Sequence, residues 1–184
     1  MNEFYLVTSW IIIALELFIV FFLLYSFKKH RFGLFFGGKS TLKKQEDHEL
    51  HSCFLSCLAV LVFYPVSANL GAYILNLPLE LIQMRQVYYF ALVCTGVSFI
   101  TVLYLLHVIR GCSFSATSRL VAYISFMLMC LNFSQLILRG YLDIHILYEV
   151  YGPFVVSFNI CTFIALSRYP FYKLMESRLT KGAV

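Results

Sequence analysis

The chain has 184 residues, of which 61% are apolar and only 12% are charged, and its formal net charge is +5 at pH 7. A soluble domain carries about 25% charged residues, so this composition excludes an ordinary water-soluble fold and indicates a chain that has lipid as its solvent. The positive charge does not require a nucleic-acid partner, because membrane topology accounts for where the basic residues lie.

Five apolar runs follow one another along the chain, and each is close to the roughly 20 residues that a helix needs to cross the hydrocarbon core. They do not alternate apolar with polar residues, as barrel strands do. A backbone in lipid must also satisfy its own hydrogen bonds, which favours helices. We therefore predict one domain, residues 1–184, of an all-α, polytopic integral membrane protein with five transmembrane helices: 4–27, 53–77, 87–109, 120–138 and 146–166.

The first run is predicted to be an uncleaved anchor. A signal peptide carries Lys or Arg before an apolar core of about 7–15 residues. Here Glu3 precedes a longer apolar run, and the basic residues Lys28, Lys29 and Arg31 follow it. This order favours a first helix that sends its N-terminus across the membrane.

The basic residues predict the orientation of the other helices. Of the 14 Lys and Arg residues, only Arg85 and Arg139 fall in the predicted outer connections, residues 78–86 and 139–145. Cytosolic loops carry the excess of Lys and Arg in membrane proteins. We therefore expect the N-terminus outside the cell and the C-terminus in the cytosol.

Two polar stretches form the predicted cytosolic face, residues 28–52 and the tail 168–184. Residues 43–49 and the tail contain good helix formers, so we expect them to extend the second and fifth helices. Aromatic residues beside the bases in the first stretch are typical of a segment that lies at the lipid interface. The cluster expected to face anionic headgroups or a partner comprises Lys28, Lys29, Arg31, Lys39, Lys43 and Lys44.

Several polar side chains lie within the predicted spans. One interpretation is a polar site or path in the outer half of the bundle, and the other is a set of interhelical hydrogen bonds that hold the helices together. Glu16, at mid-depth, should be protonated or partnered, with Asn69, Asn132 and Asn159 the nearest candidates by depth. The full set of candidates is Glu16, Asn69, Asn132, Gln135, Asn159 and Glu149.

Small residues at four-residue spacing on the second helix predict a close helix contact, within the subunit or with a second copy of the chain. They are Ser67, Ala68, Gly71 and Ala72.

Three further patterns are interpreted as structural. Residues 33–40 match the phosphate-loop pattern G-x-x-x-x-G-K-[ST], but that loop must lie between a strand and a helix, and here a membrane helix precedes it. His51 and His107 lie at similar depth, yet we expect no haem, no metal and no other cofactor. None of the six cysteines lies in a predicted outer loop, so we expect packing residues and no disulfide framework.

No arrangement of side chains indicates a reaction, so we do not expect an enzyme. The leading hypothesis is a non-enzymatic membrane subunit that anchors or signals to a cytosolic protein partner through its basic face. By its build, it resembles membrane components of bacterial two-component defence or immunity systems, which would place it in the bacterial inner (plasma) membrane. A homo-oligomer also fits this hypothesis.

Two alternatives stay open at this point. One is a small channel or transporter subunit with a polar path around Glu16. The other is a membrane redox subunit or enzyme.

Overall fold

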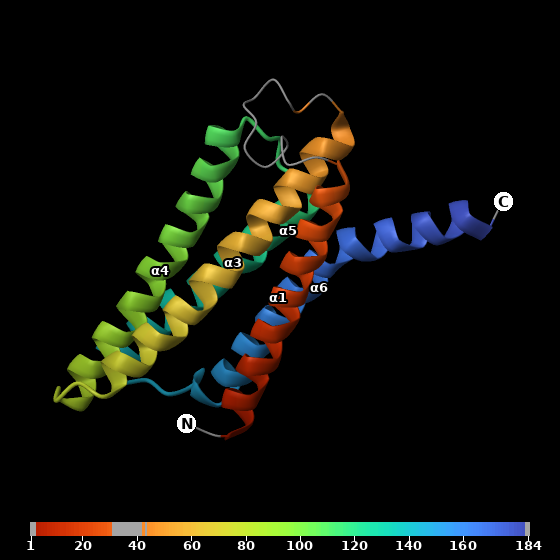
Figure 1. Cartoon of the computed structure of the whole chain (residues 1–184). Coiled ribbons are helices and arrows are strands. Elements are labelled where there is room, and N and C mark those ends of the chain that lie inside the picture. Colours follow the sequence, from red (N-terminus) through yellow and green to blue (C-terminus); the bar gives the residue numbers. More distant parts are fainter. Residues whose placement is uncertain (1–2, 31–41, 43, 183–184) are drawn as a thin grey trace.

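The structure is a computed structural model that describes residues 3–30, 42 and 44–182 (Figure 1). These residues form helices and no strand, so the all-α prediction is confirmed. The elements are α1 (Glu3–His30), α3 (Gln45–Leu75), α4 (Leu81–Arg110), α5 (Ala116–Gln135), the π-helical turn η2 (Leu136–Tyr141) and α6 (Tyr148–Gly182).

Four of these helices are long and apolar enough to cross a membrane, where η2 is counted as the continuation of α5. They cover Gln45–Leu75, Leu81–Arg110, Ala116–Tyr141 and Tyr148–Glu176. This property supports an integral membrane protein. Helix α1 has 28 residues, with an apolar part at Trp10–Tyr25, and its role as a fifth span stays a prediction, as does the orientation.

The helices are longer than the apolar runs. Helix α3 begins at Gln45, eight residues before the apolar run, and the backbone N–H of Lys44 donates to the Asp47 carboxylate at 3.2 Å beside its first turn. Helix α6 continues through Pro153 and Pro170 to Gly182. The predicted extension of the second and fifth helices into polar sequence is therefore confirmed.

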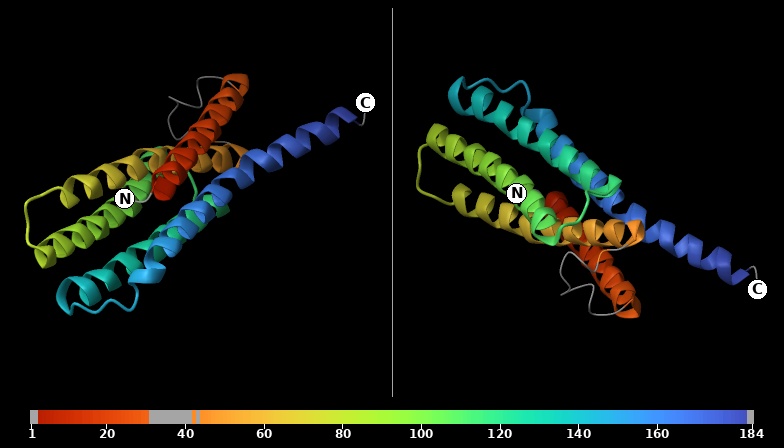
Figure 2. Two further views of the ribbon diagram at one scale, coloured as in Figure 1. Left: turned by 90° about the horizontal axis from the view of Figure 1, so that it is seen from below. Right: turned by 90° about the horizontal axis from the view of Figure 1, so that it is seen from above.

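The helices pack as two antiparallel pairs with α1 against their side. Helix α4 packs against α3 and α5, α5 packs against α6, and α1 contacts α3 and α6. Figure 2 shows the α3–α4 pair and the α5–α6 pair separating toward the end of the bundle that carries the 76–80 and 142–147 connections. The last turns of α6 project beyond the other helices (Figure 1).

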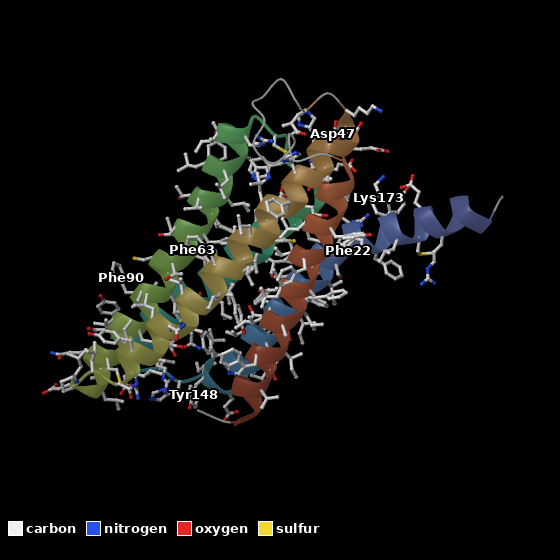
Figure 3. All side chains as sticks on the ribbon, in the orientation of Figure 1. Phe22, Asp47, Phe63, Phe90, Tyr148 and Lys173 are labelled. Carbon is white, nitrogen blue, oxygen red and sulfur yellow. The ribbon has the colours of Figure 1, made fainter. Side chains whose placement is uncertain are left out.

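The best-buried apolar side chains lie where these helices meet. Leu23 of α1, Cys53 of α3, Leu103 of α4, Val121 of α5 and Leu166 of α6 are each 0 or 1% exposed. Many other large apolar side chains point away from the bundle, as Phe90 of α4 does in Figure 3. Such an outward apolar surface is costly in water and is what a helix presents to acyl chains.

Close packing of α3 on α4 depends on Gly71. A Cβ atom at this position would lie 3.1 Å from Cε2 of Tyr88 on α4. The predicted close contact of the small-residue stripe is thus formed within the subunit at Gly71. Ala68 and Ala72 are exposed, so only part of the stripe takes part in this contact.

Candidate functional site

Glu16 lies in the interior of the bundle. Its side chain is 2% exposed, and the helix that carries it, α1, packs against α3 and α6. The carboxyl oxygen Oε2 is buried and has no hydrogen-bond partner among the described residues. A buried polar atom without a partner costs about 1–3 kcal/mol, so Glu16 reduces the stability of this helix contact.

The side chains expected to partner Glu16 are engaged elsewhere. Asn69 is exposed and donates to the Pro65 carbonyl at 2.8 Å, and Asn132 accepts a 2.7 Å hydrogen bond from the Tyr151 hydroxyl. Asn159 is half-buried on α6. Within the described part of the chain, no hydrogen bond joins any of the three to Glu16, so the structure does not form the expected pairing as a hydrogen bond.

Two other predicted polar residues lie together on α5. Asn132 and Gln135 are both buried, and Nε2 of Gln135 has no hydrogen-bond partner among residues that the structure describes. Glu149, in the first turn of α6, is exposed. Asn132 therefore joins α5 to α6 through Tyr151, whereas Glu149 lies outside this contact.

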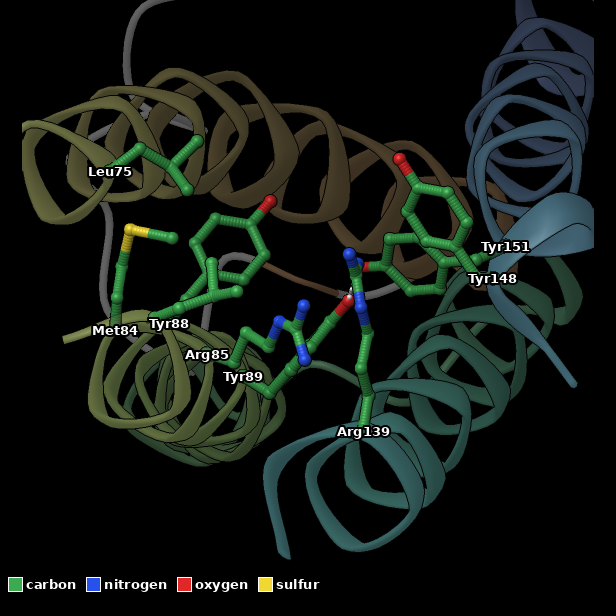
Figure 4. Close-up of a pocket in the computed structure, with 9 residues that line it drawn as sticks. Leu75, Met84, Arg85, Tyr88, Tyr89, Arg139, Tyr148 and Tyr151 are labelled. Atoms are coloured by element: carbon green, nitrogen blue, oxygen red, sulfur yellow. Dashed lines mark hydrogen bonds between the residues drawn. The ribbon is translucent and has the colours of Figure 1, made fainter. Parts of the chain in front are cut away.

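A half-open pocket of about 300 Å³ lies between α3, α4, η2 and α6, at the end of the bundle that carries the 76–80 and 142–147 connections (Figure 4). We call it the arginine–tyrosine pocket. Its polar lining comprises Arg85, Arg139, Tyr88, Tyr89, Tyr148 and Tyr151, and its apolar lining comprises Leu75, Leu81 and Met84.

The two arginines of the pocket differ in their partners. Arg85 pairs with the Asp143 carboxylate at 2.7 Å. Arg139 donates to the Tyr89 hydroxyl at 3.1 Å, and its guanidinium carbon lies 4.0 Å from the centre of the Tyr148 ring. In both arginines the Nε atom is buried and has no hydrogen-bond partner in the described structure. The pocket therefore holds two cations and two Nε–H donors that no described residue accepts.

The backbone of η2 and its close contact with α4 place Arg139 in the arginine–tyrosine pocket. The wider η2 turn follows α5 directly, and π-turns of this kind are frequent at functional sites. Next to Arg139, the carbonyl of Gly140 accepts from the Gln86 amide at 2.9 Å. A Cβ atom at Gly140 would lie 3.3 Å from Cγ of Gln86, so the glycine allows η2 to approach α4 closely.

A second polar cluster lies at the other end of the bundle, where α3 meets the start of α5. The Ser52 hydroxyl lies 2.9 Å from Nε2 of His107 and 2.6 Å from the Ser118 hydroxyl, and it accepts from the backbone N–H of Ser115 at 2.9 Å. The Ser56 hydroxyl lies 2.6 Å from that of Ser118. These contacts join α3, α4 and α5.

The geometry of His107 fixes its hydrogen-bonding roles. Nδ1 lies 2.7 Å from the Leu103 carbonyl, which only accepts, so Nδ1 carries the proton and Nε2 accepts from Ser52. A serine that donates to a histidine resembles a nucleophile–base pair. Here Ser52 and His107 are 0 and 1% exposed, so we interpret the cluster as a structural clasp closed to substrates.

No family model, no curated protein and no solved structure matches this chain. Any function must therefore be argued from the side chains themselves.

The predicted basic cluster is only partly visible. Lys44 is exposed at the start of α3. Lys28 and Lys29 belong to α1, but their side chains lie outside what the structure describes. Arg31, Lys39 and Lys43 lie outside the described residues, as does the phosphate-loop-like stretch 33–40.

The described residues place no group of three His, Cys, Asp or Glu side chains where they can hold a metal ion. All six cysteines are free. Both ring nitrogens of His107 lie within hydrogen-bond distance of protein oxygens.

Sequence reasoning missed two of these arrangements. Arg85 and Arg139 were used only to predict topology, although basic residues in predicted outer connections oppose the usual charge bias and could have singled these two out. The Ser52–His107 contact joins residues 55 positions apart, and only the packing of α3 on α4 brings them together.

Proposed function

We propose that this protein is a non-enzymatic integral membrane subunit that anchors a cytosolic protein partner. The observation that carries the proposal is the end of α6, which projects beyond the bundle (Figures 1 and 2). Its exposed side chains include four large apolar ones: Phe171 and Tyr172, each 65% exposed, Leu174, 46% exposed, and Met175, 51% exposed.

The base of this projecting segment is held by the bundle. Leu166 and Pro170 are buried, and the Lys173 ammonium lies 3.6 Å from the Glu46 carboxylate of α3 and 2.9 Å from that of Glu176. A fixed helix that presents an exposed apolar surface beside charged residues suits docking into a groove of another protein. Burial of that surface would contribute about 25 cal/mol per Å².

The topology, the basic cytosolic face and the biological setting in this proposal rest on the sequence. The proposal includes five transmembrane helices, an outer N-terminus, a cytosolic C-terminus and a basic cytosolic face with affinity for anionic headgroups. Its biological setting would be a bacterial inner membrane, as the membrane component of a two-component defence or immunity system. That setting follows from the build alone.

The channel alternative has weaker support. A conducting path requires polar side chains that share one cavity, whereas Glu16 lies in a helix contact and Asn132 is bonded to Tyr151. Asn69 is exposed on α3 and bonds its own helix. Glu16 and Asn132 therefore support dry helix contacts, and Asn69 lies outside them.

Site-specific photo-crosslinking tests the anchoring proposal. A photoreactive phenylalanine analogue at Phe171, irradiated in native membranes, should give one discrete adduct with a cytosolic protein that mass spectrometry identifies. The substitution Leu174→Glu should abolish this adduct, since a charge in a desolvated interface is costly. The analogue at Phe90, which is exposed on α4, is the matched control and should react with lipid alone.

Two outcomes would contradict the proposal. Lipid adducts alone at Phe171 would show that the end of α6 lies on the bilayer surface. An adduct of the chain with itself would show that this surface joins two copies.

A further inference from the structure

The arginine–tyrosine pocket has an excess of positive charge. Arg85 and Arg139 line it, and within the described residues the Asp143 carboxylate, 61% exposed, pairs with Arg85 and with His145 at 3.4 Å. Arg139 makes no ion pair within the described part of the chain and instead lies over the Tyr148 ring. Figure 4 shows both guanidinium groups projecting into the same space among the tyrosine rings.

No carboxylate among the described residues balances the charge of Arg139, whereas Arg85 is paired with Asp143. Two like charges that face one space repel each other, and buried charges in proteins are normally paired. The buried Nε atoms of Arg85 and Arg139 lack hydrogen-bond partners among the described residues. Guanidinium groups bind phosphate through paired N–H donors, with geometry that a lysine does not reproduce.

The rest of the lining indicates what carries the anion. Leu75, Leu81 and Met84 form an apolar wall, and the tyrosine rings add apolar faces with polar tips. The pocket lies at the ends of helices that are long enough to cross a membrane, where aromatic and basic residues meet headgroups. A volume of about 300 Å³ is at the lower end for small-molecule sites, so it holds one polar group and leaves the remainder of the molecule outside.

The sequence gives an independent reason to assign these arginines a role. They are the only Lys or Arg residues in the predicted outer connections, where basic residues oppose the usual topology signal. Both line the same pocket although they are 54 residues apart along the chain. The next residues, Gln86 and Gly140, are joined by a hydrogen bond across the same separation.

We propose that the arginine–tyrosine pocket binds the phosphate group of a phosphate ester, with Arg139 as its principal ligand and Arg85 as its second. The phosphate can come from a membrane lipid headgroup or from a soluble phosphate ester. This site is distinct from the docking surface on α6 and does not depend on it.

Binding to the purified full-length chain in a neutral detergent tests the proposal. Native mass spectrometry would measure the binding of three probes: phosphatidylglycerol, diacylglycerol and glycerol 3-phosphate. Phosphatidylglycerol should bind and diacylglycerol should not, because only the former carries a phosphate. Binding of glycerol 3-phosphate with comparable affinity would identify a soluble ester as the source, and its failure to bind would identify the lipid.

Variants separate the pocket from general electrostatic attraction. Arg139→Gln should weaken phosphatidylglycerol binding about tenfold or more, since it removes charge-assisted hydrogen bonds. Arg139→Lys should restore only part of this loss. Arg119→Gln, which removes an exposed charge near the start of α5, should leave binding unchanged.

A further variant keeps the test decisive if Arg139→Gln does not fold. Leu81 lines the pocket and is 57% exposed, so Leu81→Trp should fill the pocket without disturbing the core and should abolish binding. Unchanged binding in Leu81→Trp or Arg139→Gln, an equal loss in Arg119→Gln, or no binding of either phosphate probe would overturn the proposal.

Discussion

Glu16 combines a strong sequence signal with an unexpected environment. A carboxyl group in the middle of an apolar run is costly in lipid, which predicts that it faces protein. The structure buries it against α3, yet no Asn side chain among the described residues pairs with it. The reason is geometric, since Asn69 and Asn132 satisfy their amides on nearer groups.

We predict that Glu16→Met raises the free energy of unfolding by about 1–2 kcal/mol or leaves it unchanged. Replacing a buried polar group that lacks a partner with an apolar side chain of similar volume removes a desolvation cost. The thermal unfolding midpoint in detergent measures the effect, with the exposed Glu149→Met as control. A loss above about 2 kcal/mol would show that Glu16 has a polar partner in the native assembly.

Close contacts at two glycines shape the end of the bundle that holds the arginine–tyrosine pocket. Helix α3 approaches α4 at Gly71, and η2 approaches α4 at Gly140, where an added Cβ would lie 3.1 Å from Tyr88 and 3.3 Å from Gln86 respectively. Tyr88 and Arg139, beside these two contacts, both line the pocket. Glycine at two positions thus lets α3 and η2 approach α4, and these are three of the four elements that line the pocket.

We predict that Gly71→Leu destabilises the protein by about 1–3 kcal/mol, because a large side chain at a filled contact forces the helices apart. Ala72→Leu, one residue along and exposed, is the matched control and should change stability little. Thermal unfolding of both variants in one detergent measures the difference. Equal midpoints for the two variants would contradict the close α3–α4 contact.

At the scale of the whole molecule, the outward apolar surface of the bundle requires lipid. The number of helices that cross the membrane then decides on which side each terminus lies. Four helices meet the length and hydropathy needed for a span. Helix α1 runs alongside α3 and α6. An odd number of spans would place the two termini on opposite sides of the membrane.

We predict that a reporter active only in the cytosol works when fused after Val184 and fails when fused before Met1. The excess of Lys and Arg in residues 28–52 and 168–184 is the physical reason. Whole-cell reporter activity at equal expression measures it. Activity at both ends would mean an even number of spans, with α1 not crossing the membrane.

The sequence by itself determined the helical class, the approximate places of the helices and the burial of Glu16. These features depend on local composition and on the cost of exposing backbone or charge to lipid, and both can be read residue by residue. The extension of α3 and α6 into polar sequence was also predictable, because helix formers there continue the pattern.

Only the tertiary structure decided which polar groups meet. The Ser52–His107 clasp, the Asn132–Tyr151 bond and the placing of Arg85 and Arg139 in one pocket join residues from different helices. Apolar periodicity is too weak a guide to helix rotation when lipid and protein interior are equally apolar. The π-helical turn η2 also shifts the positions of its side chains, and no pattern in the sequence predicts this turn.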